Sequence, residues 1–174
     1  MEVLFTPWRY AYIEGHREVQ ESVTGCFLCD AVAAPDDPDR LVVYAAAHHV
    51  VVLNRHPYSN GHLMVAPRQH VASPQDASLA PREEAWPLLL LCQRVLAAAY
   101  RPDGMNVGLN LGKVAGAGVP DHYHVHLVPR WEGDTNFMTS IADTRLVPED
   151  LLQTRERLRP LFARLVAETV EAAS

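Results

Sequence analysis

Three histidines alternate with other residues in the run His122-Tyr123-His124-Val125-His126. Successive side chains of an extended strand point to opposite faces, so the three imidazoles are predicted to share one face, with neighbours roughly 7 Å apart. A buried polar group without a partner costs about 1–3 kcal/mol, and each neutral imidazole carries both a donor and an acceptor. Purely apolar packing of three such rings is disfavoured, and a role in chemistry is expected.

Two kinds of chemistry use histidines at this spacing. In a mononuclear metal site, His-x-His supplies two ligands and a later glutamate and histidine complete the set. Glu132 is available downstream, but no histidine follows His126, which weakens this interpretation. In nucleophilic catalysis, a neutral imidazole nitrogen attacks phosphorus while a hydrogen bond orients the other nitrogen. The glycines of residues 112–120 favour catalysis because their amides can approach an anion, although such turns are common without a ligand.

The elements that must position these histidines follow from the spacing of apolar residues. A helix is predicted from Ser78 to about Tyr100, with Pro87 kinking it or delaying its start. A second helical region is predicted over 148–173, divided in two at Pro160. The predicted strands are Leu41–Tyr44, His49–Leu53, Leu63–Ala66, Met105–Leu111 and Tyr123–Val128.

These elements predict an α+β fold with an antiparallel sheet of about five strands, a long helix packed on it and C-terminal helices. We expect a single domain over residues 1–174, with an irregular N-terminal segment over about 1–25 and a C-terminal helical extension over about 147–173. A chain of 174 residues with 48% hydrophobic content can bury a core of its own.

Composition excludes several classes of protein. The formal net charge is −6 and Lys113 is the one lysine of the sequence, which argues against binding to a nucleic-acid backbone. No apolar run approaches the ~20 residues of a membrane helix, and no signal peptide is evident, so a soluble cytoplasmic protein is expected. Cys26 and Cys29 are spaced for metal binding or redox chemistry, and Cys92 is expected in the core.

Two segments resemble the histidine-triad family. Residues 110–131 read Asn-Leu-Gly-Lys-Val-Ala-Gly-Ala-Gly-Val-Pro-Asp-His-Tyr-His-Val-His-Leu-Val-Pro-Arg-Trp and contain the family's motif, His-x-His-x-His followed by two apolar residues. Residues 53–65, Leu-Asn-Arg-His-Pro-Tyr-Ser-Asn-Gly-His-Leu-Met-Val, resemble its first nucleotide-contacting segment. Residues 131–138 are similar to the bacterial diadenosine tetraphosphate phosphorylase branch. The resemblance covers about residues 6–138.

The resemblance implies a role for each site residue. His124 would be the nucleophile, His122 and His126 would orient it and contact phosphate, and His62 would add a fourth histidine. Asn54 would bind the ribose hydroxyls, and apolar side chains near Val51 and Leu53 would enclose the base. Phosphate oxygens would be held by Asn110 and by the amides around Gly116, Gly118 and Val119. Gly118 or Val119 stands where the family often has serine or threonine.

The resemblance also implies a structural zinc site made of Cys26, Cys29, His70 and His122. Without it, a pair of buried cysteines would fit the Cys-x-x-Cys spacing equally well. Four protein ligands close the coordination sphere of zinc, and no redox or organic cofactor is expected. The other histidines, His16, His48, His49 and His56, are expected to be exposed or at a strand edge.

The activity implied is that of a nucleotidyl hydrolase or transferase cleaving at the α-phosphate of an adenine nucleotide or dinucleoside polyphosphate such as diadenosine tetraphosphate. A covalent nucleotidyl-histidine would then pass to orthophosphate or water, and a homodimer is implied. Activity is expected to fall below about pH 6.5. The alternatives are a phosphoramidate or adenylyl-sulfate hydrolase of the same family, a nucleotide-binding or sensing module with negligible turnover, and an oxidoreductase with a redox metal at His124 and His126.

Overall fold

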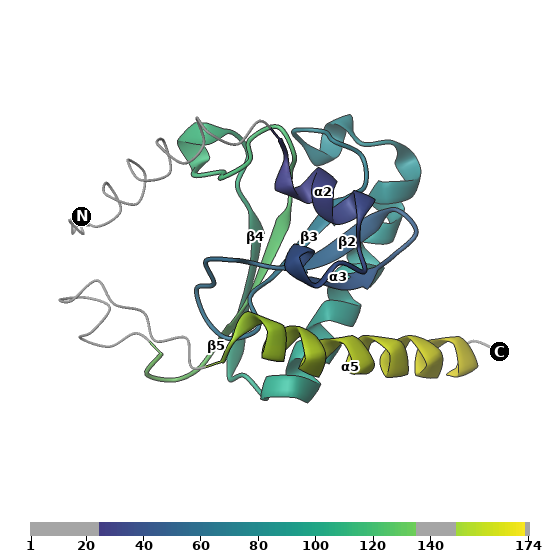
Figure 1. Ribbon diagram of the computed structural model, residues 1–174, viewed down its shortest axis with the longest axis vertical. Coiled ribbons are helices and arrows are strands. Elements are labelled where there is room, and N and C mark those ends of the chain that lie inside the picture. The colour runs from purple at the N-terminus through teal and green to yellow at the C-terminus, as the bar shows by residue number, and fades with distance from the viewer. Residues whose placement is uncertain (1–24, 135–148, 173–174) are drawn as a thin grey trace.

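The computed structural model describes residues 25–134 and 149–172, and its strands form one five-stranded antiparallel sheet in the order β1-β2-β3-β5-β4 (Figure 1). The strands are β1 (Val42–Ala45), β2 (His49–Leu53), β3 (Leu63–Pro67), β4 (Gly104–Leu109) and β5 (Val125–Arg130). The predicted antiparallel sheet is confirmed. The predictions for the N-terminal segment, for His16 and for residues 135–138 lie outside the described residues.

Strand β5 begins two residues later than predicted, at Val125, so His122 and His124 precede it. Its pairing with β3 ends where Val65 lies opposite Val125. Pro67 closes β3 and has no amide hydrogen with which to extend the ladder. The amide of Tyr123 instead donates to the carbonyl of Val71, 2.9 Å away, which draws the histidine segment out of the sheet.

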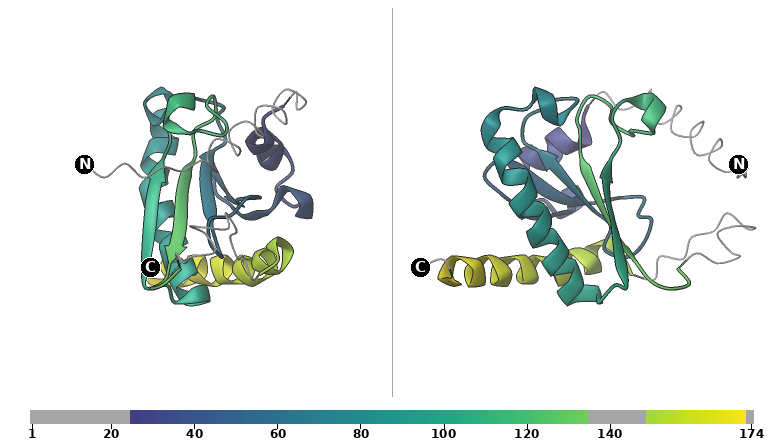
Figure 2. Two further views of the ribbon diagram at one scale, coloured as in Figure 1. Left: turned by 90° about the vertical axis from the view of Figure 1, so that its left-hand side faces the viewer. Right: turned by 180° about the vertical axis from the view of Figure 1, so that it is seen from behind.

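Strands β2 and β3 are buried along their whole length, because helices cover them on both faces of the sheet. The helices α3 (Leu79–Tyr100) and α5 (Leu151–Ala172) pack with Val51, Leu53 and Leu63 on one face. The short helix α2 (Phe27–Ala33) packs with Val50 and Val52 on the other (Figure 2). Three short 3₁₀ turns complete the described elements: η1 (Pro38–Arg40), η2 (Pro74–Asp76) and η3 (Lys113–Ala115).

Both long helices run through a proline. The predicted long helix is confirmed and is continuous across Pro87, whereas the predicted division of the C-terminal region at Pro160 is wrong because α5 is one helix. Leu158 and Phe162 on either side of Pro160 are buried in the same core. Burying each such side chain contributes about 1.5–3 kcal/mol, which together offsets the ~3 kcal/mol that an interior proline costs.

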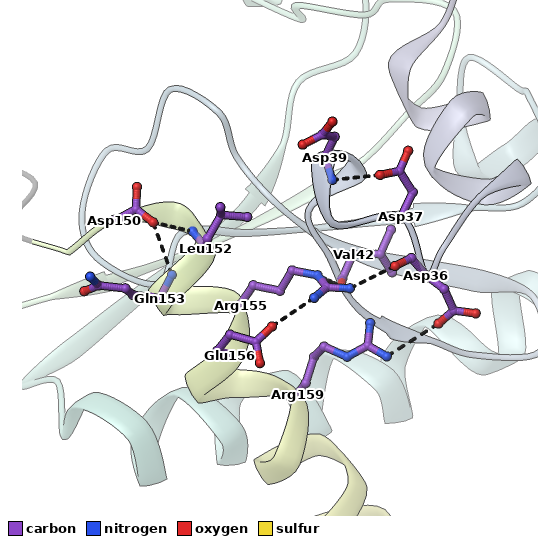
Figure 3. Close-up of polar contacts among 10 residues, drawn as sticks. All are labelled: Asp36, Asp37, Asp39, Val42, Asp150, Leu152, Gln153, Arg155, Glu156 and Arg159. Carbon is purple, nitrogen blue, oxygen red and sulfur yellow. Dashed lines mark hydrogen bonds and ion pairs between the residues drawn. The ribbon is translucent and has the colours of Figure 1, made fainter.

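Helix α5 is anchored to the edge of the sheet by a buried arginine (Figure 3). The side chain of Arg155 is 6% exposed, and its guanidinium donates to the carbonyls of Val42 at 3.2 Å and Asp36 at 3.3 Å. The carboxylate of Asp150 accepts from the amide of Leu152 and so caps the helix. Within the described ranges, no helix is both long and apolar enough to cross a membrane.

Candidate active site

Three histidines, His62, His124 and His126, come together on the face of the sheet that carries α2. His126 lies opposite Met64 in the ladder, and Met64 lies opposite Val52, so these three side chains share a face. His62 immediately precedes β3 on that face, and its Nε2 lies 2.9 Å from Nδ1 of His126. The ring of His124 lies 4.8 Å from that of His126, nearly perpendicular to it.

Backbone and amide donors determine which nitrogens of His62 and His126 carry protons. Nδ1 of His62 accepts from the amide of Tyr58 at 3.1 Å and faces Nδ2 of Asn54 at 3.4 Å. The proton of a neutral His62 therefore lies on Nε2, where it is donated to Nδ1 of His126. A neutral His126 consequently carries its proton on Nε2 and presents it as a donor.

His124 has the opposite arrangement, which suits a nucleophile. Its Nδ1–H donates to the carbonyl of His122 at 3.0 Å, so its Nε2 keeps the lone pair. The side chain is 5% exposed, and its orientation is determined by backbone two residues upstream. The ring of His124 that keeps this lone pair thus lies next to the ring of His126 that carries an N–H donor.

Burial favours the neutral forms of His124 and His126. Burial lowers the pKa of His124 below its ordinary value of 6.5. Burial, and then the neighbouring His124, lower the pKa of His126 to about 4. The acid limb of activity expected near pH 6.5 therefore moves to lower pH, because burial disfavours the protonated form.

A second cluster lies next to the triad. The ligand atoms of Cys26, Cys29, His70 and His122 all lie within 4.8 Å of one another. Nδ1 of His122 is 3.3 Å from Sγ of Cys26 and 3.5 Å from Sγ of Cys29, and Nδ1 of His70 is 3.1 Å from Sγ of Cys29. Neighbouring ligand atoms of a tetrahedral zinc site lie roughly 3.3–3.8 Å apart, so these residues fit zinc.

The surroundings of this cluster also suit a cation. Nε2–H of His122 donates to the carbonyl of Pro67 at 2.8 Å, which leaves the Nδ1 lone pair directed at the two sulfurs. Without a cation, burial, and then the adjacent Cys26, raise the pKa of the Cys29 thiol to about 11. A divalent metal would stabilise the thiolate at neutral pH. His122 therefore belongs to both clusters.

The glycine-rich loop before the triad is tightly turned. Gly112 and Gly116 have φ values of 79° and 88°, which favour glycine. The amide of Gly116 donates to the carbonyl of Lys113 at 2.9 Å, and the Gly116 carbonyl accepts from Asn110. The amide of Gly116 is therefore engaged within the loop. The loop is tied to the triad through the carbonyl of Val119, which accepts from the amide of His122 at 3.4 Å, and Gly118 is exposed beside it.

Two predictions need correction. Leu53 and Val51 lie in the core beneath α3, on the face opposite the histidines, so neither side chain contacts a base bound there. A one-residue shift along a strand reverses the face, and Val52 is the residue of β2 that faces the site. His49 is not exposed: it is 1% exposed and bonded to Glu84 of α3 at 2.8 Å. Cys92 lies in the core as predicted.

Sequence reasoning missed two residues of this site. Tyr58 contacts His62 and His126 with its ring and donates its amide to His62. Pro67 accepts from His122 through its carbonyl. Both hydrogen bonds use backbone atoms, which every residue type supplies, so no residue pattern could reveal them.

The fold and the histidine constellation have known counterparts. The HIT domain family matches residues 37–133, more than half of the chain, so the chain belongs to the histidine triad (HIT) family. It is 36% identical over 167 residues to the AP-4-A phosphorylase of Mycobacterium tuberculosis, covering 94% of this chain and 86% of that protein. It is 29% identical over 92 residues to a bis(5'-adenosyl)-triphosphatase of Saccharomyces cerevisiae, covering 52% of this chain and 44% of that protein.

The crystal structure of a zinc-bound histidine triad family protein from Mycobacterium smegmatis has the same fold. Its TM-score to this chain is 0.66 at 25% sequence identity, over 83% of this chain and 97% of the other.

Proposed function

We propose that this protein is a nucleotidyl hydrolase or transferase that cleaves adenine dinucleotides such as diadenosine tetraphosphate at the α-phosphate. The observation that carries the proposal is the hydrogen bond from Nδ1–H of His124 to the carbonyl of His122, which leaves a lone pair on Nε2 of His124 in a ring that packs against His126. The names of the relatives, AP-4-A phosphorylase and bis(5'-adenosyl)-triphosphatase, support this substrate class.

The reaction takes place in two displacements. Nε2 of His124 attacks the α-phosphorus, the bond from phosphorus to the bridging oxygen breaks, and that oxygen leaves with the electron pair. Nε2–H of His126 donates a hydrogen bond to the departing oxygen, and His62 holds His126 in that orientation. The acceptor then attacks phosphorus, and the P–N bond breaks to restore the lone pair of His124.

The nucleotide is held by the loops around the triad. Asn54 would bind the ribose hydroxyls, and Val52 replaces Leu53 as the residue of β2 that faces the base. Asn110, Gly118 and Val119 would contact phosphate oxygens from the loop before the triad. The carboxamide of Asn54 is already oriented by the amide of His56, 2.9 Å from its Oδ1.

Orthophosphate is the acceptor that we propose, and water is the second candidate. The relative that covers most of the chain is named a phosphorylase, whereas the bis(5'-adenosyl)-triphosphatase matches about half of it. Both acceptors would attack the same phosphorus, so the choice between them changes the products without changing the roles of the histidines.

A structural zinc ion bound by Cys26, Cys29, His70 and His122 completes the proposal. The zinc holds its four ligands together and supplies no open position for substrate. Through its ligand His122, it would keep in place the carbonyl that orients His124. Thiolate ligands persist in a reducing compartment, which fits the cytoplasm.

A homodimer is proposed from the exposed edge of the sheet. Strand β4 is an outer strand, and its Val107 and Leu109 are 43% and 39% exposed. An apolar strand edge with unpaired backbone groups favours pairing with a second copy. Sedimentation of the purified chain should give twice the monomer mass, and Val107→Lys should lower the measured mass toward that of the monomer.

The test is product analysis with diadenosine tetraphosphate, with and without orthophosphate. We expect adenosine nucleotide products that require orthophosphate, and an adenylylated protein in samples quenched before the acceptor is added. His124→Ala should lose activity at least a thousandfold, whereas His48→Ala, which changes an exposed histidine, should retain it. Products that form without phosphate would assign a hydrolase. Full activity of His124→Ala would overturn the proposed nucleophile.

A further inference from the structure

The His62–His126 pair is covered by one aromatic side chain from the loop before β3. The ring centroid of Tyr58 lies 4.7 Å from that of His62 and 6.2 Å from that of His126, with 23° between the latter two planes. The Tyr58 side chain is 46% exposed, whereas His62 is 1% exposed. The tyrosine ring therefore shields the His62 side of the pair, whereas His126 is half-buried.

The backbone of the same residue acts on the pair from another direction. The amide of Tyr58 donates to Nδ1 of His62, and Nδ2 of Asn54 faces that nitrogen as well. A proton on Nδ1 would oppose two N–H donors, so His62 is restricted to its Nε2–H form. Since Nε2–H of His62 then donates to Nδ1 of His126, the proton of His126 lies on Nε2.

We propose that Tyr58 is a positioning residue that holds His126 as a neutral Nε2–H donor, its amide determining the tautomer and its ring excluding water from the His62–His126 bond. This inference rests on the proposed function in one respect, namely that the Nε2–H of His126 donates to the departing oxygen. Shielding matters because water that reaches Nδ1 of His126 would compete with His62 for that acceptor and would stabilise the imidazolium.

The described groups that face His126 contain no carboxylate. They are His62 and Tyr58 from the loop before β3, Met64 opposite it in the ladder, Gly108 from β4, and His124 on its own segment. The hydrogen-bond chain and the cover of Tyr58 are therefore the features that favour a neutral ring. Burial already lowers the pKa of His126 to about 4, which agrees with an effective cover.

The test compares Tyr58→Ala with Tyr58→Phe in the full-length, zinc-loaded chain. Both variants retain the backbone amide, and only alanine removes the ring. Nitrogen-15 NMR of the histidines, recorded without nucleotide, reports tautomer and titration midpoint. We expect wild type and Tyr58→Phe to show His126 as Nε2–H and neutral at pH 6. Tyr58→Ala should raise the titration midpoint of His126 by at least one pH unit.

Kinetics with diadenosine tetraphosphate provide the second measurement. Tyr58→Ala should lower kcat about tenfold at pH 6, less at pH 8, with KM within threefold, whereas general loss of structure would lower the rate at every pH. An unchanged His126 titration in Tyr58→Ala, or a Tyr58→Phe variant that behaves like alanine, would overturn the proposal. Failure of the proposed function is distinct, because every variant would then be inactive while the NMR differences remained.

Discussion

Gly61 lies where the chain turns into His62, and adding one methyl group there should destabilise the protein measurably. Its φ is +71°, a conformation that costs an L-residue roughly 1–2 kcal/mol. A Cβ at this position would also lie 2.7 Å from Cε2 of Tyr100, well inside the ordinary contact distance of about 3.5–4.0 Å. Overpacking of this kind costs about 1–3 kcal/mol, so Gly61→Ala should lose about 2–5 kcal/mol in total.

Two other glycines separate these contributions. Gly133 has φ +77° with nothing within 4 Å of an added Cβ, so Gly133→Ala should show the backbone cost alone, about 1–2 kcal/mol. Gly104 has open space and no positive φ, so Gly104→Ala should stay within about 0.5 kcal/mol of wild type. From the most to the least stable variant, the order should be Gly104→Ala, then Gly133→Ala, then Gly61→Ala.

Thermal and urea unfolding of the three variants measure these differences. For a chain of 174 residues, a loss of about 2–5 kcal/mol corresponds to a Tm lower by roughly 5–15 °C. Tyr100 is itself held by a 2.5 Å hydrogen bond from its hydroxyl to Glu149, which limits how far the ring can move away. If Gly61→Ala were as stable as Gly133→Ala, the ring of Tyr100 would have moved aside and the reasoning would be refuted.

Three further predictions concern the metal site, the nucleophile and the C-terminal helix. Cys29→Ser should lower zinc content, measured by elemental analysis, from one ion per chain to a small fraction and should lower Tm; retention of stoichiometric zinc would exclude Cys29 as a ligand. Because burial lowers the pKa of His124, the neutral nucleophile should persist below pH 6.5, and kcat/KM should fall to half its plateau only below that pH. A midpoint of this acid limb at or above pH 6.5 would contradict the buried site. Arg155→Ala leaves the carbonyl of Val42 without this donor and should lower the free energy of unfolding in urea by about 1–3 kcal/mol. Arg159→Ala removes only a surface ion pair and should lower it by under about 1 kcal/mol. Equal effects of the two substitutions would refute the anchoring role of Arg155.

Strands β2 and β3 could be predicted because each one is a short apolar run bounded by turn residues. His49–Leu53 was predicted with its ends as observed, and Leu63–Ala66 extends by one residue to Pro67. Local pattern failed at Pro160, where the covalent limits of proline predict a break that burial of Leu158 and Phe162 overrides. It failed again at Leu53, because alternation defines two faces without stating which one carries the site.

The sequence by itself indicated which kinds of side chain make up both clusters. The pattern His-x-His-x-His left a nitrogen nucleophile or a metal site as the candidates, and the pattern Cys-x-x-Cys left metal binding, redox chemistry or a buried pair, before any fold was known. The approach of Cys26 to His122, 96 positions later, depends on the folded sheet and on α2.

Only the tertiary structure decided which nitrogen of each histidine carries the proton and which keeps the lone pair. Those choices depend on the carbonyls of His122 and Pro67 and on the amide of Tyr58, which are backbone atoms that any residue would supply. Their placement follows from strand register, from the proline that ends β3 and from the turn before His62. A sequence specifies its side chains one by one, whereas the direction of a hydrogen bond depends on which two segments folding brings within about 3 Å of each other.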